Sequence, residues 1–156
     1  MDKTTIKIIM DFLKSEEDKS SLKWILLHDI ESIPEKYFHK GALELSGELI
    51  TKLPKNLEVT EQLDLSFSTI TELPEKLTIG DNLYLYNCKD LKSLPDNLYV
   101  GGDLHMQRTG IKEFPIGMIV KGTIWLIGSP LGRQTIREIQ SQLDERNCKV
   151  HGHIMV

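Results

Sequence analysis

LPKNLEVTEQLDL, residues 53–65, contains the pattern that decides the fold of this chain. An apolar residue followed by proline returns along the sequence at intervals of 20, 20, 21 and 20 residues. These pairs are Ile33-Pro34, Leu53-Pro54, Leu73-Pro74, Leu94-Pro95 and Phe114-Pro115. A unit this short cannot bury an apolar side alone, so successive units must stack and share one core. The spacing predicts a repeat solenoid of about five turns over residues 33–131, with function on its surface.

Each unit reads L-P-x-x-L-x-V-x-x-x-L-x-L, in which two short stretches alternate. Period-two alternation is typical of a strand with one buried face, so L-x-V and L-x-L predict two strands per turn. The positions predicted to point inward are Leu57, Val59, Leu63, Leu65, Ile70, Leu77, Ile79, Leu83, Leu85, Leu91, Leu98, Val100, Leu104, Met106, Ile111, Met118, Val120, Ile124, Leu126 and Leu131. Gly and Asp between the two strands favour a sharp corner, for which we expect positive φ. The corner residues are Thr60-Glu61, Gly80-Asp81, Gly101-Gly102 and Lys121-Gly122.

Over roughly residues 33–131, this pattern resembles a leucine-rich repeat of the short type with an L-P-x-x-L segment, seen in bacterial effector-like proteins. The family places an asparagine three residues after the second strand leucine, where its side chain bonds the backbone of adjacent turns. The residues at this position here are Glu48, Ser68, Cys88, Thr109 and Ser129. Ser, Thr and Cys offer a small donor, which predicts a weaker ladder. The departure leaves a squarer β-coil as an alternative.

Helical spacing replaces the repeat at both ends of the sequence. It predicts helices over residues 4–14, after Ser20-Ser21, and over 133–146, where Ile136, Ile139 and Leu143 share one face. A solenoid must cover its apolar ends. We therefore expect one mainly β structural domain of leucine-rich-repeat type with helical caps: an N-terminal cap at 1–32, the solenoid at 33–131, and a C-terminal helix and tail at 132–156. The alternative for the N-terminal hairpin is a docking element.

Composition and charge limit the number of domains, the class of partner and the cellular location that we expect. The 156 residues, 40% hydrophobic and 27% charged, fit one globular domain, and the net charge of −4 with scattered lysines argues against direct nucleic-acid binding. Residues 1–14 are too short and too charged for a signal peptide or membrane span, so we expect no membrane partner. Cys88 and Cys148 form no disulfide framework. These features predict a cytoplasmic protein, in the host cytoplasm if it is a signal-less secreted or phage protein.

Three sets of residues contain types used in catalysis or metal binding, and none completes a site. Cys148, His151 and His153 lack a fourth zinc ligand. Cys88 and Asp90 resemble the Cys-x-Asp of ubiquitin ligases fused to some effector repeats, but the helical ligase domain has no counterpart here. Hydrolase-triad residue types occur without a nucleophile elbow in Asp64, Ser66, Ser68 and His105. We expect no enzyme, no catalytic residue, no metal and no cofactor.

The residue between the two leucines of each L-x-L points to solvent, and stacking sets such residues in columns about 4.8 Å apart. The central column is Glu44, Asp64, Tyr84, His105 and Trp125, flanked by Gln62, Asn82, Asp103 and Thr123 and by Ser46, Ser66, Tyr86, Gln107 and Ile127. The face runs from acidic to aromatic, and Tyr and Trp are enriched at binding hot spots. The predicted partner-binding residues are Glu44, Asp64, Tyr84, Tyr86, Asp103, His105, Gln107 and Trp125. The alternative is packing, with the third helix or residues 148–156 folded over Trp125.

Three functions follow. The first is a protein-binding module that grips another protein through the sheet face, as a small adaptor or an inhibitor, for example a bacterial or phage effector that blocks a host protein. The second is a structural unit that pairs with a second copy into a homo-oligomer. The third is an enzyme, which the absence of a catalytic cluster makes the least favoured.

Overall fold

The computed structural model describes residues 22–156, and the chain divides into two compact units, Met1–Ile33 and Pro34–Val156. The described part of the first unit holds helix α2 (Leu22–His28) and the 3-10 turn η1 (Ile30–Ser32). Leu22 and Leu26 are buried, as expected for one face of the predicted second helix. The helix predicted over 4–14 and the Ser20-Ser21 cap lie outside the described residues.

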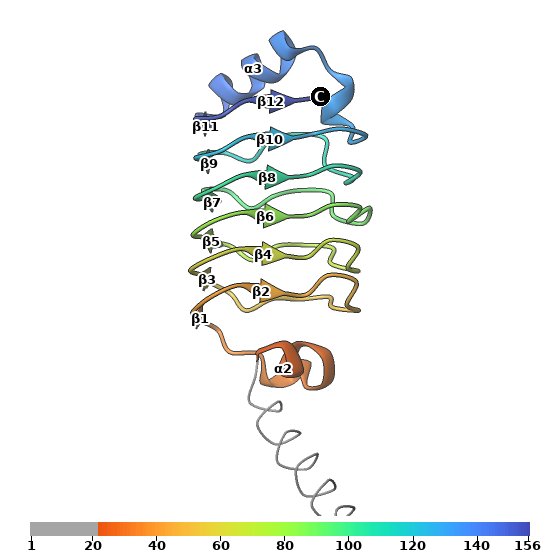
Figure 1. Cartoon of the computed structure of the whole chain (residues 1–156), viewed down its shortest axis with the longest axis vertical. Helices are drawn as coiled ribbons and strands as arrows, with labels where there is room; N and C mark the ends of the chain where they lie inside the picture. The colour runs from red at the N-terminus through yellow and green to blue at the C-terminus, as the bar shows by residue number, and fades with distance from the viewer. Residues whose placement is uncertain (1–21) are drawn as a thin grey trace, which may run out of the picture. The chain divides into compact units, whose positions relative to one another are not determined.

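The second unit is a parallel β-solenoid in which each turn, called a rung here, gives one strand to each of two sheets (Figure 1). Sheet A contains β1 (Tyr37–His39), β3 (Leu57–Val59), β5 (Thr78–Ile79), β7 (Tyr99–Val100), β9 (Ile119–Val120) and β11 (Lys149–Val150). Sheet B contains β2 (Leu43–Glu44), β4 (Leu63–Asp64), β6 (Leu83–Tyr84), β8 (Leu104–His105), β10 (Ile124–Trp125) and β12 (Ile154–Met155). The predicted pair of strands in each repeat is confirmed.

The register between rungs reproduces the spacing of the sequence. In sheet B, Leu63 lies opposite Leu83, and Leu83 lies opposite Leu104. The second of these steps is one residue longer, so the extra residue of that repeat is taken up outside the strands. The approximately 20-residue repeat is therefore the physical rung of the solenoid.

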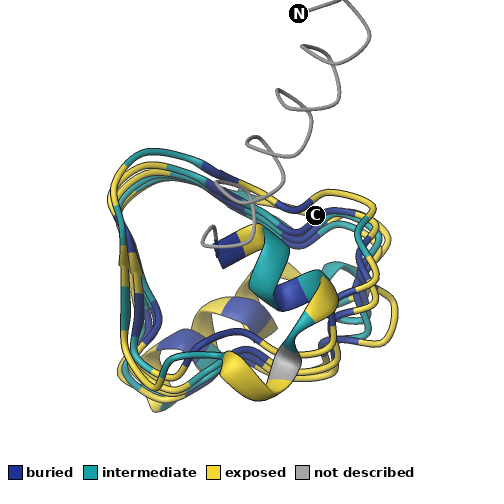
Figure 2. Cartoon of the chain, turned by 90° about the horizontal axis from the view of Figure 1, so that it is seen from below, coloured by how far each residue is buried: buried dark blue, intermediate teal, exposed yellow. Residues whose placement is uncertain are grey.

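The core fills the inside of the rungs. Every repeat position predicted to point inward is at most 1% exposed. Figure 2, viewed along the coil, shows that the buried segments recur at the same places on successive rungs. Burial of these aliphatic side chains contributes about 1.5 to 3 kcal/mol each, so the shared core is the main source of stability.

The corner between the two strands differs from the expectation, because the predicted glycines Gly80, Gly101, Gly102 and Gly122 do not have positive φ. Positive φ occurs at this corner on the first rung, where Gly41 between β1 and β2 has a φ of 98°. Gly80 and Gly101 are needed there for space: a Cβ on Gly80 would collide with the carbonyl of Thr60, and one on Gly101 with the carbonyl of Gly80. Left-handed backbone occurs instead at two other corners. One lies two residues after Pro54, Pro74, Pro95 and Pro115, at Asn56, Lys76, Asn97 and Gly117. The other follows sheet B, at Gly47, Phe67, Asn87, Arg108 and Gly128.

The ladder expected after the second strand is present in part. The Cys88 thiol donates to the carbonyl of Leu65 on the preceding rung, with 3.0 Å between sulfur and oxygen. Thr109 and Ser129 instead donate to carbonyls three residues earlier in their own rungs. Cys88 thus bridges two rungs, whereas Thr109 and Ser129 bond within one rung, which is weaker bridging than an asparagine ladder provides.

The last repeat leads through the 3-10 turn η2 (Leu131–Arg133) into helix α3 (Ile136–Glu145). The helix begins later than predicted because Thr135 and Glu138 form a capping box. Ile139 and Leu143 are buried as expected, but Ile136 is 49% exposed and does not share their buried face. After α3, β11 and β12 return to the coil and extend both sheets beyond the predicted end of the solenoid at residue 131.

Candidate binding surface

The outer face of sheet B carries one continuous column of side chains. The strand register aligns Glu44, Asp64, Tyr84, His105 and Trp125, in the predicted order. Met155 continues the column, since β12 pairs with β10. Met155 was missed because the tail lacks the repeat pattern.

Three rings of this column stack on one another, and we call Tyr84, His105 and Trp125 the ring column. The centroids of Tyr84 and His105 are 4.6 Å apart with 18° between the planes. His105 and Trp125 are 5.7 Å apart with 4° between the planes. All three side chains are half-buried, because each ring covers part of the next. The surface is therefore an ordered aromatic stack that stays partly open to solvent.

The flank that precedes each sheet B strand links adjacent rungs. Asn82 Oδ1 accepts the N–H of Asp103 at 2.7 Å, and Asp103 Oδ1 accepts the N–H of Thr123 at 2.8 Å. Asp103 Oδ2 also accepts the indole N–H of Trp125 at 3.5 Å. We call Asn82, Asp103 and Thr123 the polar ladder. Its side chains bond the backbone of the next rung, a role expected for the residue three positions after the second strand leucine. Both oxygens of Asp103, a predicted partner contact, are engaged within the fold.

The column carries a neutral imidazole among its rings and carboxylates at its other end. Partial burial lowers the pKa of His105 below 6.5, against the opposing effect of the Asp103 carboxylate. The imidazole is therefore neutral at neutral pH, which suits a ring packed between two aromatic neighbours. At the other end, exposed Glu44 accepts a hydrogen bond from Gln62 Nε2 at 2.7 Å, and Asp64 Oδ1 accepts the N–H of Ser66 at 2.8 Å.

The opposite flank contains a second aromatic group, beside the predicted residue Tyr86. Phe67 meets Tyr86 edge to face with 5.1 Å between centroids, and the guanidinium carbon of Arg108 lies 5.6 Å from the centre of the Tyr86 ring. We call Phe67, Tyr86 and Arg108 the corner cluster. Phe67 and Arg108 were not predicted from the sequence, because they occupy the left-handed corner after the strand and not the alternating pattern.

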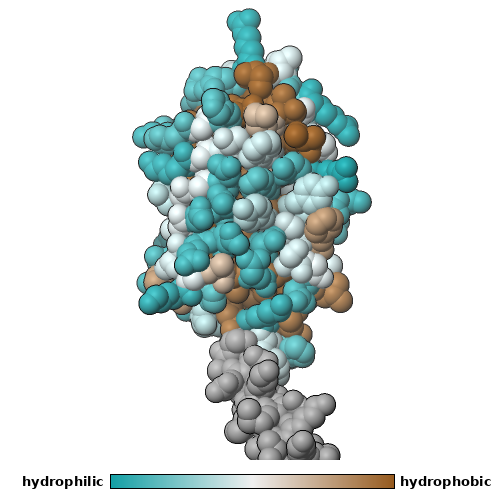
Figure 3. Space-filling view, in the orientation of Figure 1, coloured by the Kyte–Doolittle hydropathy of each residue, from teal (hydrophilic) through white to brown (hydrophobic). Residues whose placement is uncertain are grey.

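Figure 3 views the molecule from the side on which sheet B lies in Figure 1. Polar atoms cover much of this face, and apolar atoms gather toward the end that carries β12. Exposed apolar side chains in this part of the sequence include Ile127, Met155 and Val156, which are 50%, 39% and 49% exposed. The acidic-to-aromatic column thus ends beside an apolar patch.

The residues considered for catalysis and metal binding do not converge. Asp64 and His105 lie on rungs separated by the rung of Tyr84, and Ser66 is buried. The Cys148 thiol donates to the carbonyl of Pro115 at 3.0 Å, and burial raises its pKa. Residues 22–156 contain no cluster of three or more His, Cys, Asp or Glu side chains arranged to hold a metal ion.

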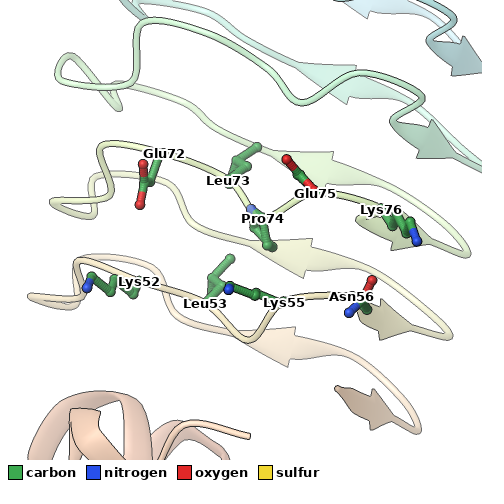
Figure 4. A pocket seen from close by; sticks show the side chains of 9 residues that line it. All are labelled: Lys52, Leu53, Lys55, Asn56, Glu72, Leu73, Pro74, Glu75 and Lys76. Atoms are coloured by element: carbon green, nitrogen blue, oxygen red, sulfur yellow. The ribbon is translucent and has the colours of Figure 1, made fainter. Parts of the chain in front are cut away.

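A groove of about 560 Å³ lies on the Leu-Pro side of the coil (Figure 4). Its lining comes from two rungs and carries charges of both signs, at Lys52, Lys55, Glu72, Glu75 and Lys76. A similar groove follows on the next rungs, lined in part by Pro95 and Asn97. The repetition indicates that these hollows arise from the spacing of the rungs rather than from a dedicated site.

Comparison with known proteins gives no relative: no family matches this chain, and neither a curated protein nor a solved structure is significantly similar to it. Within the part of the chain that the structure describes, none of the helices is long and apolar enough to span a membrane.

Proposed function

We propose that this chain is a protein-binding module that acts as a small adaptor or inhibitor through the outer face of sheet B. The ring column is the observation that carries the proposal. Tyr84 and Trp125 are large amphipathic side chains held in order by stacking, so a partner that covers them loses little side-chain entropy. Tyr, Trp and Arg are also the residues most enriched at binding hot spots.

The other sheet provides an internal comparison. Its outer column contains Phe38, Glu58, Thr78, Tyr99, Ile119 and Lys149. The aromatic residues Phe38 and Tyr99 are separated there by two rungs, so they cannot form a stack like that of sheet B. Concentration of ordered rings on one sheet favours sheet B as the binding face.

The proposal includes the repeat family and the biological role that the sequence predicts. The 20-residue spacing and the buried consensus positions support a leucine-rich-repeat type, and helical caps remain part of this proposal. A chain of this type needs no catalytic group, since it acts by occupying or bridging surfaces. A bacterial or phage effector that blocks a host protein, in the cytoplasm, is the specific form that we propose.

Self-association is the second candidate function. The exposed side chains of Ile127, Met155 and Val156 favour it, because an apolar patch beside an outer strand can pair with a second copy. Sedimentation equilibrium at several concentrations separates the two candidates. A monomer at all concentrations supports the binding module, whereas a concentration-dependent mass supports the structural unit.

The decisive experiment is affinity capture from a lysate of the source or host cell, followed by mass spectrometry and titration of the captured protein. Wild type is compared with the Tyr84→Ala/Trp125→Ala variant, and with Tyr99→Ala as a matched aromatic change on sheet A. We expect the double variant to bind the captured protein at least about tenfold more weakly than wild type does, and Tyr99→Ala to leave the affinity unchanged. Equal retention by all three proteins would contradict the proposal.

A further inference from the structure

We propose that the corner cluster is a subsite for an acidic residue of the protein partner, an Asp or Glu that is flanked by an apolar side chain in an extended segment. The inference rests on the proposed function and adds the chemistry of the bound segment. Phe67, Tyr86 and Arg108 come from three successive rungs, and each lies two or three residues after its sheet B strand, β4, β6 or β8. The cluster therefore continues the surface of the ring column at its edge.

The backbone of Phe67 is the first observation behind this subsite. Phe67 has a φ of 59°, in the left-handed region, and its side chain is 56% exposed. The equivalent residues on neighbouring rungs include Gly47, Asn87 and Gly128, types that adopt this conformation at low cost. A bulky aromatic residue is strained there, because its Cβ crowds the neighbouring carbonyl oxygen. A binding role accounts for a strained ring that remains exposed to water.

The charge of Arg108 is the second observation. Its side chain is exposed, and no carboxylate within residues 22–156 forms an ion pair with it. Arg146, by contrast, pairs with Glu113 at 2.6 Å. A guanidinium that lies on the face of a ring keeps its N–H edges available, and these edges match a carboxylate in bidentate geometry. The exposed face of the cluster is thus complementary to an acidic side chain.

The third observation is an amide oxygen without a hydrogen bond, in the flank column that contains Tyr86. Gln107 lies between Tyr86 and Ile127 along this flank, and its Oε1 is buried with no hydrogen-bond donor. A buried acceptor without a partner has lost its bonds to water and gained none in return, which is unfavourable. Rotation of this amide toward the main-chain N–H of a bound segment would remove that cost. An extended segment along the flank therefore places its carboxylate at Arg108 and its apolar side chain on Phe67 or Ile127.

The test uses a random-peptide phage library that is selected on the full-length chain. One enriched peptide is then synthesised and titrated by fluorescence anisotropy. We expect Asp or Glu beside an apolar residue, and about tenfold weaker binding to Arg108→Asn and to Phe67→Gly. Asn and Gly are native at this corner on other rungs, so neither variant should lower the melting temperature. Arg137→Gln, an exposed arginine on α3, is the control and should leave the affinity unchanged.

A peptide in which the acid is replaced by its amide should bind wild type as weakly as the acid binds Arg108→Asn, with little further loss when both changes are combined. Enriched peptides without an acid, full affinity in Arg108→Asn, or no enrichment above bare matrix would each overturn the subsite. Binding that survives Arg108→Asn but is lost in Tyr84→Ala/Trp125→Ala would reject the subsite and leave the proposed function intact. Failure of the lysate capture would count against the proposed function itself.

Discussion

The imidazole of His105 lies parallel to the indole of Trp125 on the next rung, with 5.7 Å between ring centroids and 4° between planes. Tyr84 stacks on the other side of the same imidazole. Ring faces therefore join neighbouring rungs. This arrangement makes the column both a part of the scaffold and a surface that a partner can cover.

A pH dependence follows from this packing. The folded chain lowers the pKa of His105 below its ordinary value of 6.5, chiefly through burial, so the unfolded chain binds the proton more readily. The free energy of unfolding should be highest above this value and should fall as the pH drops through it. His105→Phe keeps an aromatic ring and removes the titration. In urea unfolding from about pH 8 to about pH 5, the stability of wild type should fall relative to this variant. Parallel curves would contradict the assignment.

Leu85→Ala tests the repeat core. Leu85 is fully buried, and its truncation should lower the free energy of unfolding by about 2 to 5 kcal/mol through lost burial and an internal cavity. Leu49→Ala is the matched control, because Leu49 is 78% exposed and should change stability by less than about 0.5 kcal/mol. Denaturant titration measures both. Equal effects would show that the inward register is wrong.

Asp103→Ala tests the polar ladder. It removes the acceptor for the Thr123 N–H and should cost about 1 to 3 kcal/mol of stability. Asp103→Asn keeps an acceptor, as Asn82 does on the preceding rung, and should retain most of the stability. Asp90→Ala, at an exposed position, is the control. If thermal unfolding did not distinguish Asp103→Ala from Asp90→Ala, the ladder would not contribute to stability.

Gly80→Ala tests the close approach of rungs at the corner. A methyl group there would collide with the Thr60 carbonyl, so the rungs must separate, and the loss should reach about 3 kcal/mol. Gly47→Ala is the comparison: it introduces no collision, but Gly47 has a φ of 73°, which costs about 1 kcal/mol. Calorimetry should give the larger drop in melting temperature for Gly80→Ala. The reverse order would indicate that backbone conformation outweighs space.

The sequence predicted the parts of the structure that depend on period. Leu63, Leu83 and Leu104 recur at the repeat spacing, and the same period placed Tyr84, His105 and Trp125 in one column. The local alternation of apolar and polar residues shows which side chains point inward, so these predictions required no knowledge of long-range contacts.

The parts that depend on contacts between rungs were missed. Gly80 was interpreted as a conformational requirement, although the neighbouring carbonyl demands it. The link between rungs made by the carboxylate of Asp103 was not predicted either. Phe67 gave no signal, because a left-handed phenylalanine is not expected from sequence preference. These features depend on a neighbouring rung or on a strained backbone, which composition and spacing do not encode.

Site-specific photo-crosslinking tests the central claim most directly. Benzoylphenylalanine replaces Tyr84 on sheet B in one protein and Tyr99 on sheet A in another, and each is irradiated in a lysate of the source or host cell. The account predicts that the sheet B probe links the chain to a different protein and that the sheet A probe links none. Crosslinks of equal yield from both probes, or a sheet B product formed only with a second copy of the chain, would contradict it.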